Sequence, residues 1–168
     1  MTFAERLAGV IEAVVDVFGR LAAYVGVALV LLVAGNVFAR YFFRTGTIWL
    51  QELEWHLIAP IALIGMSYTL LKGEQVRVDF LYEQMPQALR QVVEIVTGIL
   101  TIVFAVIVVK LSLPFVEQAW RIGEGSPNPG GMPYRGALKA LIPFGFALLA
   151  LQGLAHSLRH GLALLQRS

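Results

Sequence analysis

The chain has 168 residues, of which 58% are hydrophobic and 14% are charged, and its mean hydropathy is +0.73. Soluble domains carry roughly 25% charged residues, so this composition excludes an ordinary soluble domain. The absence of cysteine excludes disulfides, thiolate metal sites and iron–sulfur clusters. The net charge is +2 at pH 7, and the basic residues lie between apolar runs. We interpret them as anchors at the membrane edge, so the expected partner is a lipid bilayer and not nucleic acid.

Four apolar stretches predict membrane-spanning helices, at residues 21–39, 57–71, 95–109 and 140–155. A helix needs about 20 residues to cross a bilayer, so the last three stretches span it only together with their flanking residues. The sequence predicts an all-α membrane protein with one integral membrane domain over residues 1–168. The expected transmembrane helices cover approximately residues 18–40, 48–71, 87–118 and 137–158.

Before the first span, residues 1–17 have apolar side chains at helical spacing, with most of the charged side chains on the other side. This pattern predicts an amphipathic helical segment that lies in the membrane interface. The alternative is that the first spanning helix simply begins early. Glu5, Glu12 and Asp16 offset the nearby arginines, which argues against a cleaved signal peptide.

Aromatic and charged residues cluster between the first two spans. Tyr41, Trp49 and Trp55 are expected at the level of the lipid headgroups. Glu52 and Glu54 are two positions apart on a helix, so they face different directions and do not form an acid–base pair. We therefore predict no enzyme activity, and we hypothesise that Arg40 pairs with Glu52 or Glu54.

Histidine spacing gives little support for a metal or haem. Glu52 and His56 share a helical face, but two ligands are too few. His156 and His160 also share a face, at the opposite membrane surface from His56, so the two sets do not hold one haem between them. We predict no metal and no cofactor.

The polar links constrain the topology. An even number of spans places both termini on one side, but nearly equal numbers of Lys and Arg on the two sides leave the orientation open. The glycine- and proline-rich segment 121–136 predicts an irregular loop. The span interiors carry no ionisable residue and no internal repeat is visible, which argues against a transporter or small exporter that acts alone.

Several segments together resemble the small membrane subunit of tripartite ATP-independent periplasmic (TRAP) transporters, the DctQ-type component. Asn36, Arg40 and Tyr41 fit its N-x-x-x-R-Y/F signature, and Trp49 and Glu52 fit the W-x-x-E segment that follows. Residues 73–79 resemble its V-R-V-D link, and residues 126–135 and 140–146 resemble the loop and fourth helix of one branch.

This resemblance implies a multi-pass subunit of the bacterial inner membrane with both termini in the cytoplasm. The implied partners are a large TRAP membrane subunit with the substrate and sodium sites, and a periplasmic substrate-binding protein that delivers an organic acid. The small subunit would act as the scaffold for the large one. The candidate partner-interface residues are Arg40, Tyr41, Trp49, Glu52, Glu54 and His56 at the periplasmic side, and Arg77 and Asp79 at the cytoplasmic link.

Two questions stay open at this point. The 121–136 loop either docks a partner or is a plain connector. The main alternative function is a membrane anchor subunit of a redox complex, in which a helix bundle would hold haem or quinone.

Overall fold

The computed structural model describes residues 3–75 and 85–165, which form four helices and no strand. The helices are α1 (Phe3–Phe43), α2 (Ile48–Lys72), α4 (Gln87–Arg121) and α5 (Arg135–Leu165). All four are long and apolar enough to cross a membrane. The prediction of an all-α membrane protein with four transmembrane helices is confirmed.

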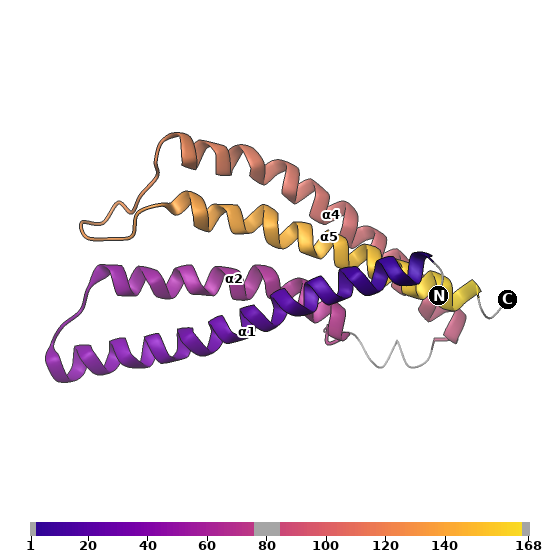
Figure 1. The fold of residues 1–168 in the computed structure, drawn as a ribbon, viewed down its shortest axis with the longest axis horizontal. Helices are drawn as coiled ribbons and strands as arrows, with labels where there is room; N and C mark the ends of the chain where they lie inside the picture. The colour runs from indigo at the N-terminus through magenta and orange to yellow at the C-terminus, as the bar shows by residue number, and fades with distance from the viewer. Residues whose placement is uncertain (1–2, 76–84, 166–168) are drawn as a thin grey trace.

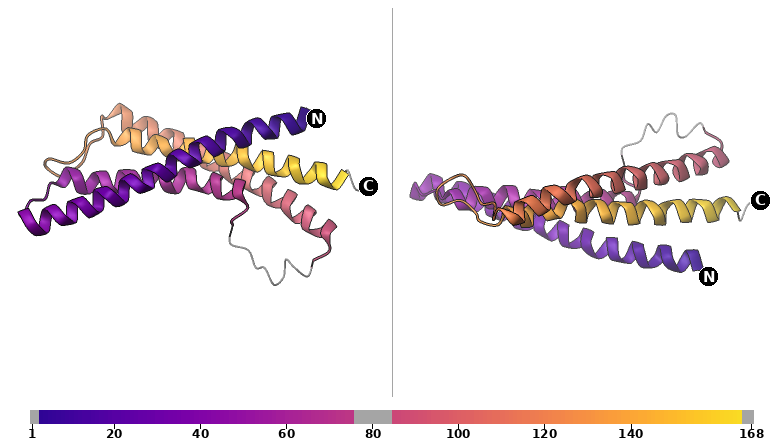
Figure 2. Two further views of the ribbon diagram at one scale, coloured as in Figure 1. Left: turned by 60° about the horizontal axis from the view of Figure 1, so that its bottom comes forward. Right: turned by 90° about the horizontal axis from the view of Figure 1, so that it is seen from above.

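The helices form two hairpins, α1 with α2 and α4 with α5 (Figure 1). Residues 44–47 and 122–134 make the hairpin turns at one end of the bundle, which we call the loop end. The described parts nearest the two termini lie at the opposite end, which we call the terminal end. α5 contacts all three other helices and joins the hairpins, and Figure 2 shows it between α1 and α4 at the terminal end.

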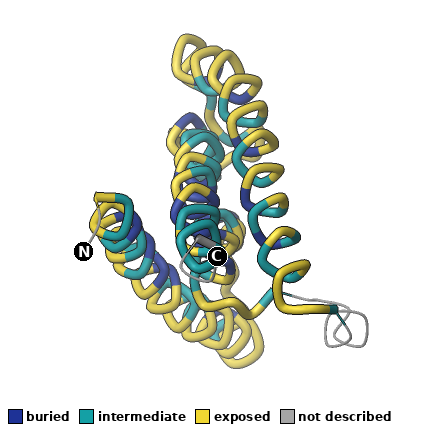
Figure 3. Tube along the Cα trace, turned by 90° about the vertical axis from the view of Figure 1, so that its right-hand side faces the viewer, coloured by how far each residue is buried: buried dark blue, intermediate teal, exposed yellow. Residues whose placement is uncertain are grey.

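A narrow stripe of small and branched side chains holds α1 against the bundle. Ala8, Ile11, Val15, Gly19 and Ala22 recur at intervals of three or four residues and therefore share one face of α1. Apart from Gly19, they form a buried cluster with Ile64 of α2 and with Leu148 and Ala155 of α5. The outer faces of the helices are mostly exposed (Figure 3), and many of their exposed side chains are large and hydrophobic, as contact with lipid favours.

Glycines allow the closest helix contacts. A Cβ atom at Gly145 of α5 would lie 2.7 Å from the Leu63 Cβ and 2.8 Å from the Leu63 carbonyl oxygen of α2. Gly98 of α4 and Gly153 of α5 meet in the same way, since a Cβ at Gly153 would lie 3.1 Å from the Gly98 oxygen. Small residues at such crossings let membrane helices pack backbone to backbone.

The predicted segment 1–17 and span 18–40 lie in one uninterrupted helix of 41 residues, α1, with no break between them. The interfacial placement of residues 1–17 stays a prediction. The buried stripe continues across the predicted boundary, and Glu12 and Asp16 bond to Arg159 of α5 and Lys72 of α2. At 1.5 Å per residue α1 is about 60 Å long, roughly twice the hydrocarbon thickness of a bilayer. The early start of the first helix, which was the alternative, describes the structure better.

The other predicted bounds need smaller corrections. α2 ends one residue after the predicted 48–71, whereas α4 and α5 exceed the predicted 87–118 and 137–158. At their C-terminal ends α4 and α5 continue past the apolar stretches into segments that contain charged residues but still form helix. Hydropathy alone therefore places the C-terminal end of each helix too early. Pro86 immediately precedes α4, and its lack of an N–H costs nothing there.

Candidate functional site

At the loop end, the Glu52 carboxylate of α2 binds the 122–134 loop and the start of α5. Its Oε1 accepts hydrogen bonds from Ser126 Oγ and from Asn128 Nδ2, the latter at 3.1 Å. Its Oε2 accepts one from the Met132 backbone N–H at 2.7 Å, and Arg135 Nη2 lies 3.8 Å from Oε1. Glu52 is only 7% exposed. We call these five residues the Glu52 clamp.

The loop is shaped to present these donors. The Ser126 N–H donates to the Met132 oxygen at 3.0 Å, and the Arg135 N–H donates to the Glu124 oxygen at 2.9 Å. A Cβ atom at Gly131 would lie 2.7 Å from Glu52 Oε2 and 2.3 Å from Ser126 Oγ, so only glycine fits without rearrangement. Gly131 is therefore explained by how closely the loop backbone approaches the carboxylate at this position.

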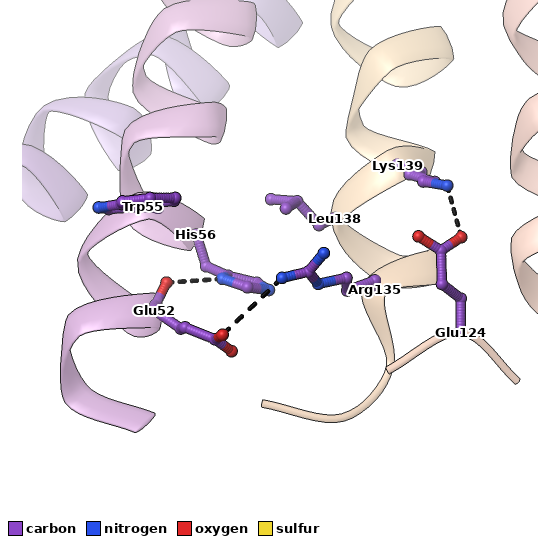
Figure 4. Close-up of a pocket in the computed structure, with 7 residues that line it drawn as sticks. All are labelled: Glu52, Trp55, His56, Glu124, Arg135, Leu138 and Lys139. Atoms are coloured by element: carbon purple, nitrogen blue, oxygen red, sulfur yellow. Dashed lines mark hydrogen bonds and ion pairs between the residues drawn. The ribbon is translucent and has the colours of Figure 1, made fainter. Parts of the chain in front are cut away.

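A pocket of about 250 Å³ lies behind the clamp, between α2 and α5 (Figure 4). Its lining residues are Glu52, Trp55, His56, Glu124, Arg135, Leu138 and Lys139. The two carboxylates and the two cations balance in charge, and Lys139 pairs with Glu124 while its ammonium lies 3.8 Å from the centroid of the Phe115 ring. Among these lining residues both carboxylates are already engaged, so neither is placed as a general base.

His56 of α2 also lines the pocket. Its Nδ1 lies 2.7 Å from the Glu52 backbone oxygen and donates to it, which leaves Nε2 as an acceptor. Nε2 is buried and has no hydrogen-bond partner among the described residues. The ring is thus oriented by α2 itself and points into the pocket.

Three other predicted residues lie at the loop end but outside the clamp. Arg40 and Tyr41 are in the last turn of α1 and are exposed, Tyr41 to 82%, and Trp49 in the first turn of α2 is also exposed. These three side chains are free of the bundle core and accessible to a partner or to lipid headgroups. Arg77 and Asp79 lie outside the described residues.

The hypothesis that Arg40 pairs with Glu52 or Glu54 is wrong. Glu52 turns toward α5 and is occupied by the clamp, whereas Glu54 Oε1 accepts a hydrogen bond from Asn36 Nδ2 of α1 at 2.8 Å. Positions two apart on a helix point in different directions, as the sequence indicated. Each carboxylate therefore fixes a different contact, one to the second hairpin and one within the first.

Sequence reasoning did not identify the partners of these carboxylates. Asn36 was noted only as part of a motif, and Ser126 and Asn128 only as loop residues. The available signal was the unusual density of glycine and proline in residues 125–133, which indicates a loop of defined shape.

The match to a known protein family covers the same region of the chain. A family model described as "Tripartite ATP-independent periplasmic transporters, DctQ component" matches residues 29–161. The matched range contains α2, α4, all five residues of the Glu52 clamp and the Asn36–Glu54 contact. No curated protein shows significant similarity to the chain.

Proposed function

The chain belongs to the DctQ component family of TRAP transporters, and from that premise we propose that it is a scaffold for a large transport subunit. In this proposal the large subunit carries the substrate and sodium sites, and a periplasmic binding protein delivers an organic acid. The chain is a multi-pass membrane protein and a transporter subunit. The proposed location is the bacterial inner membrane, with the terminal end in the cytoplasm.

The Glu52 clamp is the observation that carries the proposal. It ties the first hairpin to the second at the loop end through a carboxylate that is almost fully buried. At the terminal end, Arg159 of α5 donates two hydrogen bonds to the carboxylate of Glu12 in α1, at 2.8 and 2.6 Å. A bundle fastened at both ends is suited to hold still while a partner moves against it.

The described helices also support the proposal that the large subunit, and not this chain, carries the substrate path. Each is continuous, and each contains a long stretch without Asp, Glu, Lys, Arg or His, at residues 21–39, 57–71, 95–109 and 140–155. Transporters that bind substrate themselves commonly place broken helices or charged groups near the bilayer midplane. A substrate path in the large subunit agrees with this arrangement, and the redox-anchor alternative gains no support from the family match.

Partner identity is tested by purification. The tagged chain is extracted gently from its native membrane, and co-eluting proteins are identified by mass spectrometry. We expect a stoichiometric multi-helix membrane protein and no haem absorption. A chain that elutes alone, or with a haem protein, would contradict the proposal.

The role of the clamp is tested by Glu52→Gln, with Glu117→Gln as the matched control. Gln keeps the size of Glu52 but removes its charge, whereas Glu117 is exposed and, within the part of the chain that the structure describes, pairs with Arg121 of its own helix α4. We expect Glu52→Gln to lower both complex yield and substrate uptake at equal membrane insertion, and Glu117→Gln to leave both unchanged. Equal uptake by the two variants would show that the clamp is dispensable.

Orientation is tested with single cysteines, since the chain has none of its own. Thr45 lies in the turn before α2 and Glu74 directly follows the other end of α2, and both are exposed. A maleimide that does not cross membranes should label Thr45→Cys in cells with a permeable outer membrane. It should label Glu74→Cys only after the inner membrane is opened. The reverse pattern would contradict the proposed orientation.

A further inference from the structure

A buried cluster of one carboxylate and two imidazoles lies between α4 and α5 near the terminal end. Glu94 is 4% exposed and His156 is 9% exposed, and His156 Nε2 lies 2.8 Å from Glu94 Oε2. His160 stands beside them, with its ring centroid 4.5 Å from that of His156. One ligand atom from each of the three side chains lies within 4.8 Å of the other two.

The fold brings these three groups together in a defined way. His156 and His160 are four positions apart and therefore share one face of α5. Glu94 faces them from α4, one turn before Gly98, and Gly98 packs against Gly153 and Ser157 of α5. This close backbone contact fixes the separation of the two helices next to the cluster.

The donor set is one that transition metals of the zinc class prefer. Imidazole nitrogen and carboxylate oxygen bind Zn²⁺ at about 2.0–2.2 Å, which places neighbouring tetrahedral ligands roughly 3.3 Å apart. The 4.8 Å limit therefore requires only small side-chain movements to reach that geometry.

A neighbouring amide supports the ligand geometry of His160. His160 Nδ1 lies 2.7 Å from Gln91 Oε1, an oxygen that only accepts, so Nδ1 carries the proton. The lone pair of the neutral ring is then on Nε2. Metal-binding histidines usually donate their other ring N–H to such a partner, which fixes the tautomer and the ring orientation.

We propose that Glu94, His156 and His160 bind a transition metal ion of the zinc class, with water completing the coordination. The ion ties α4 to α5 near the terminal end. This site goes beyond the scaffold function and does not depend on it, because it acts within the chain.

Metal binding is tested on the full chain, purified in detergent with a tag that contains no histidine and treated with chelator. Co²⁺ is titrated first, because tetrahedral Co²⁺ absorbs visible light, and Zn²⁺ is then added to displace it. We expect about one equivalent of Co²⁺ per chain. Zn²⁺ should also raise the midpoint of thermal unfolding, since a ligand that binds the folded state stabilises it.

Variants identify the ligands. His56 is the only other histidine among the 3 in the chain and lies near the loop end, so His56→Gln is the matched control and should bind normally. His160→Gln should lose the Co²⁺ absorption. Gln91→Ala, which removes only the supporting amide, should weaken binding roughly 10- to 100-fold.

The wild-type titration decides the proposal even where a variant fails to fold. Absence of Co²⁺ absorption and of stabilisation by Zn²⁺ in the wild type would show that Glu94 and His156 form only a hydrogen-bonded pair. Binding that persists in His160→Gln but is lost in His56→Gln would place the metal elsewhere and overturn the assignment.

Discussion

The contact between Gly145 and Leu63 allows a quantitative test of how α5 meets α2. A methyl group at Gly145 would lie 2.7 Å from the Leu63 Cβ and 2.8 Å from the Leu63 oxygen, whereas ordinary contact begins at 3.4 Å. The helices must therefore separate by roughly 0.7 Å, or Leu63 must move with its backbone. A Cβ at Gly65 of α2 has nothing within 4 Å, so Gly65→Ala is the matched control.

The magnitude follows from two terms. Replacing glycine by alanine in a helix interior stabilises it by about 1 kcal/mol, and this gain applies at both positions. Inserting a carbon into a tightly packed contact costs about 1–3 kcal/mol, and this cost applies only at Gly145. We expect Gly145→Ala to be less stable than Gly65→Ala by about 1–3 kcal/mol, with Gly145→Val still less stable.

The assay is reversible unfolding of the purified chain in mixed micelles at increasing dodecyl sulfate, followed by circular dichroism. The free energy of unfolding of each variant is compared with that of the wild type under the same conditions. Equal stability of Gly145→Ala and Gly65→Ala would refute the reasoning, because it would show that the backbones of α2 and α5 are not in contact at Gly145.

Two further predictions concern polar contacts of α1. Arg159 and Glu12 are 45% and 25% exposed, so a double-mutant cycle with Arg159→Gln and Glu12→Gln should give a coupling of about 0–1 kcal/mol. The coupling should shrink in high salt, and one insensitive to salt would contradict an exposed pair. Asn36 is buried and bonds to Glu54, so Asn36→Ala should lower the free energy of unfolding by about 1–3 kcal/mol. Asn36→Asp should lower it further, because it places a second carboxylate beside Glu54, and an equal effect of the two substitutions would argue against the contact.

The helices were predictable because their signal is local. Four apolar stretches, flanked by charged and aromatic residues, indicate four spans without any knowledge of tertiary contacts. The same local signal did not show that α1 is one uninterrupted helix. Its first half is amphipathic, which is typical of an interfacial helix. The apolar residues of that pattern, such as Leu7, Val10 and Val14, are exposed, whereas α1 packs on α2 and α5 through the neighbouring stripe of Ala8, Ile11 and Val15. Periodicity reveals an apolar face and not the surface that covers it.

The candidate site was predictable only in part because its partners are distant in sequence. Glu52 was singled out as an ionisable residue at a membrane edge, but its donors Ser126 and Met132 lie 74 and 80 positions away. The nearer cation, Arg40, was the more obvious choice and was incorrect. Glu94 and His156 are 62 positions apart, and neither carries a local signal that they meet.

The placement of these distant contacts explains how a chain with so few charges forms a fixed bundle. In lipid, an apolar side chain gains little free energy when it exchanges contact with lipid tails for contact with another helix. Helix packing therefore depends on close backbone contact and on polar pairs. Here the glycine contacts lie along α5, at Gly145 against α2 and at Gly153 against α4. The polar contacts lie toward the two ends of the same helix, with Arg135 near Glu52 at one end and His156 with Glu94 toward the other. α5 is therefore the helix on which both hairpins are fixed, and substitutions on its inner face should disturb subunit assembly more than substitutions on the exposed face of α1.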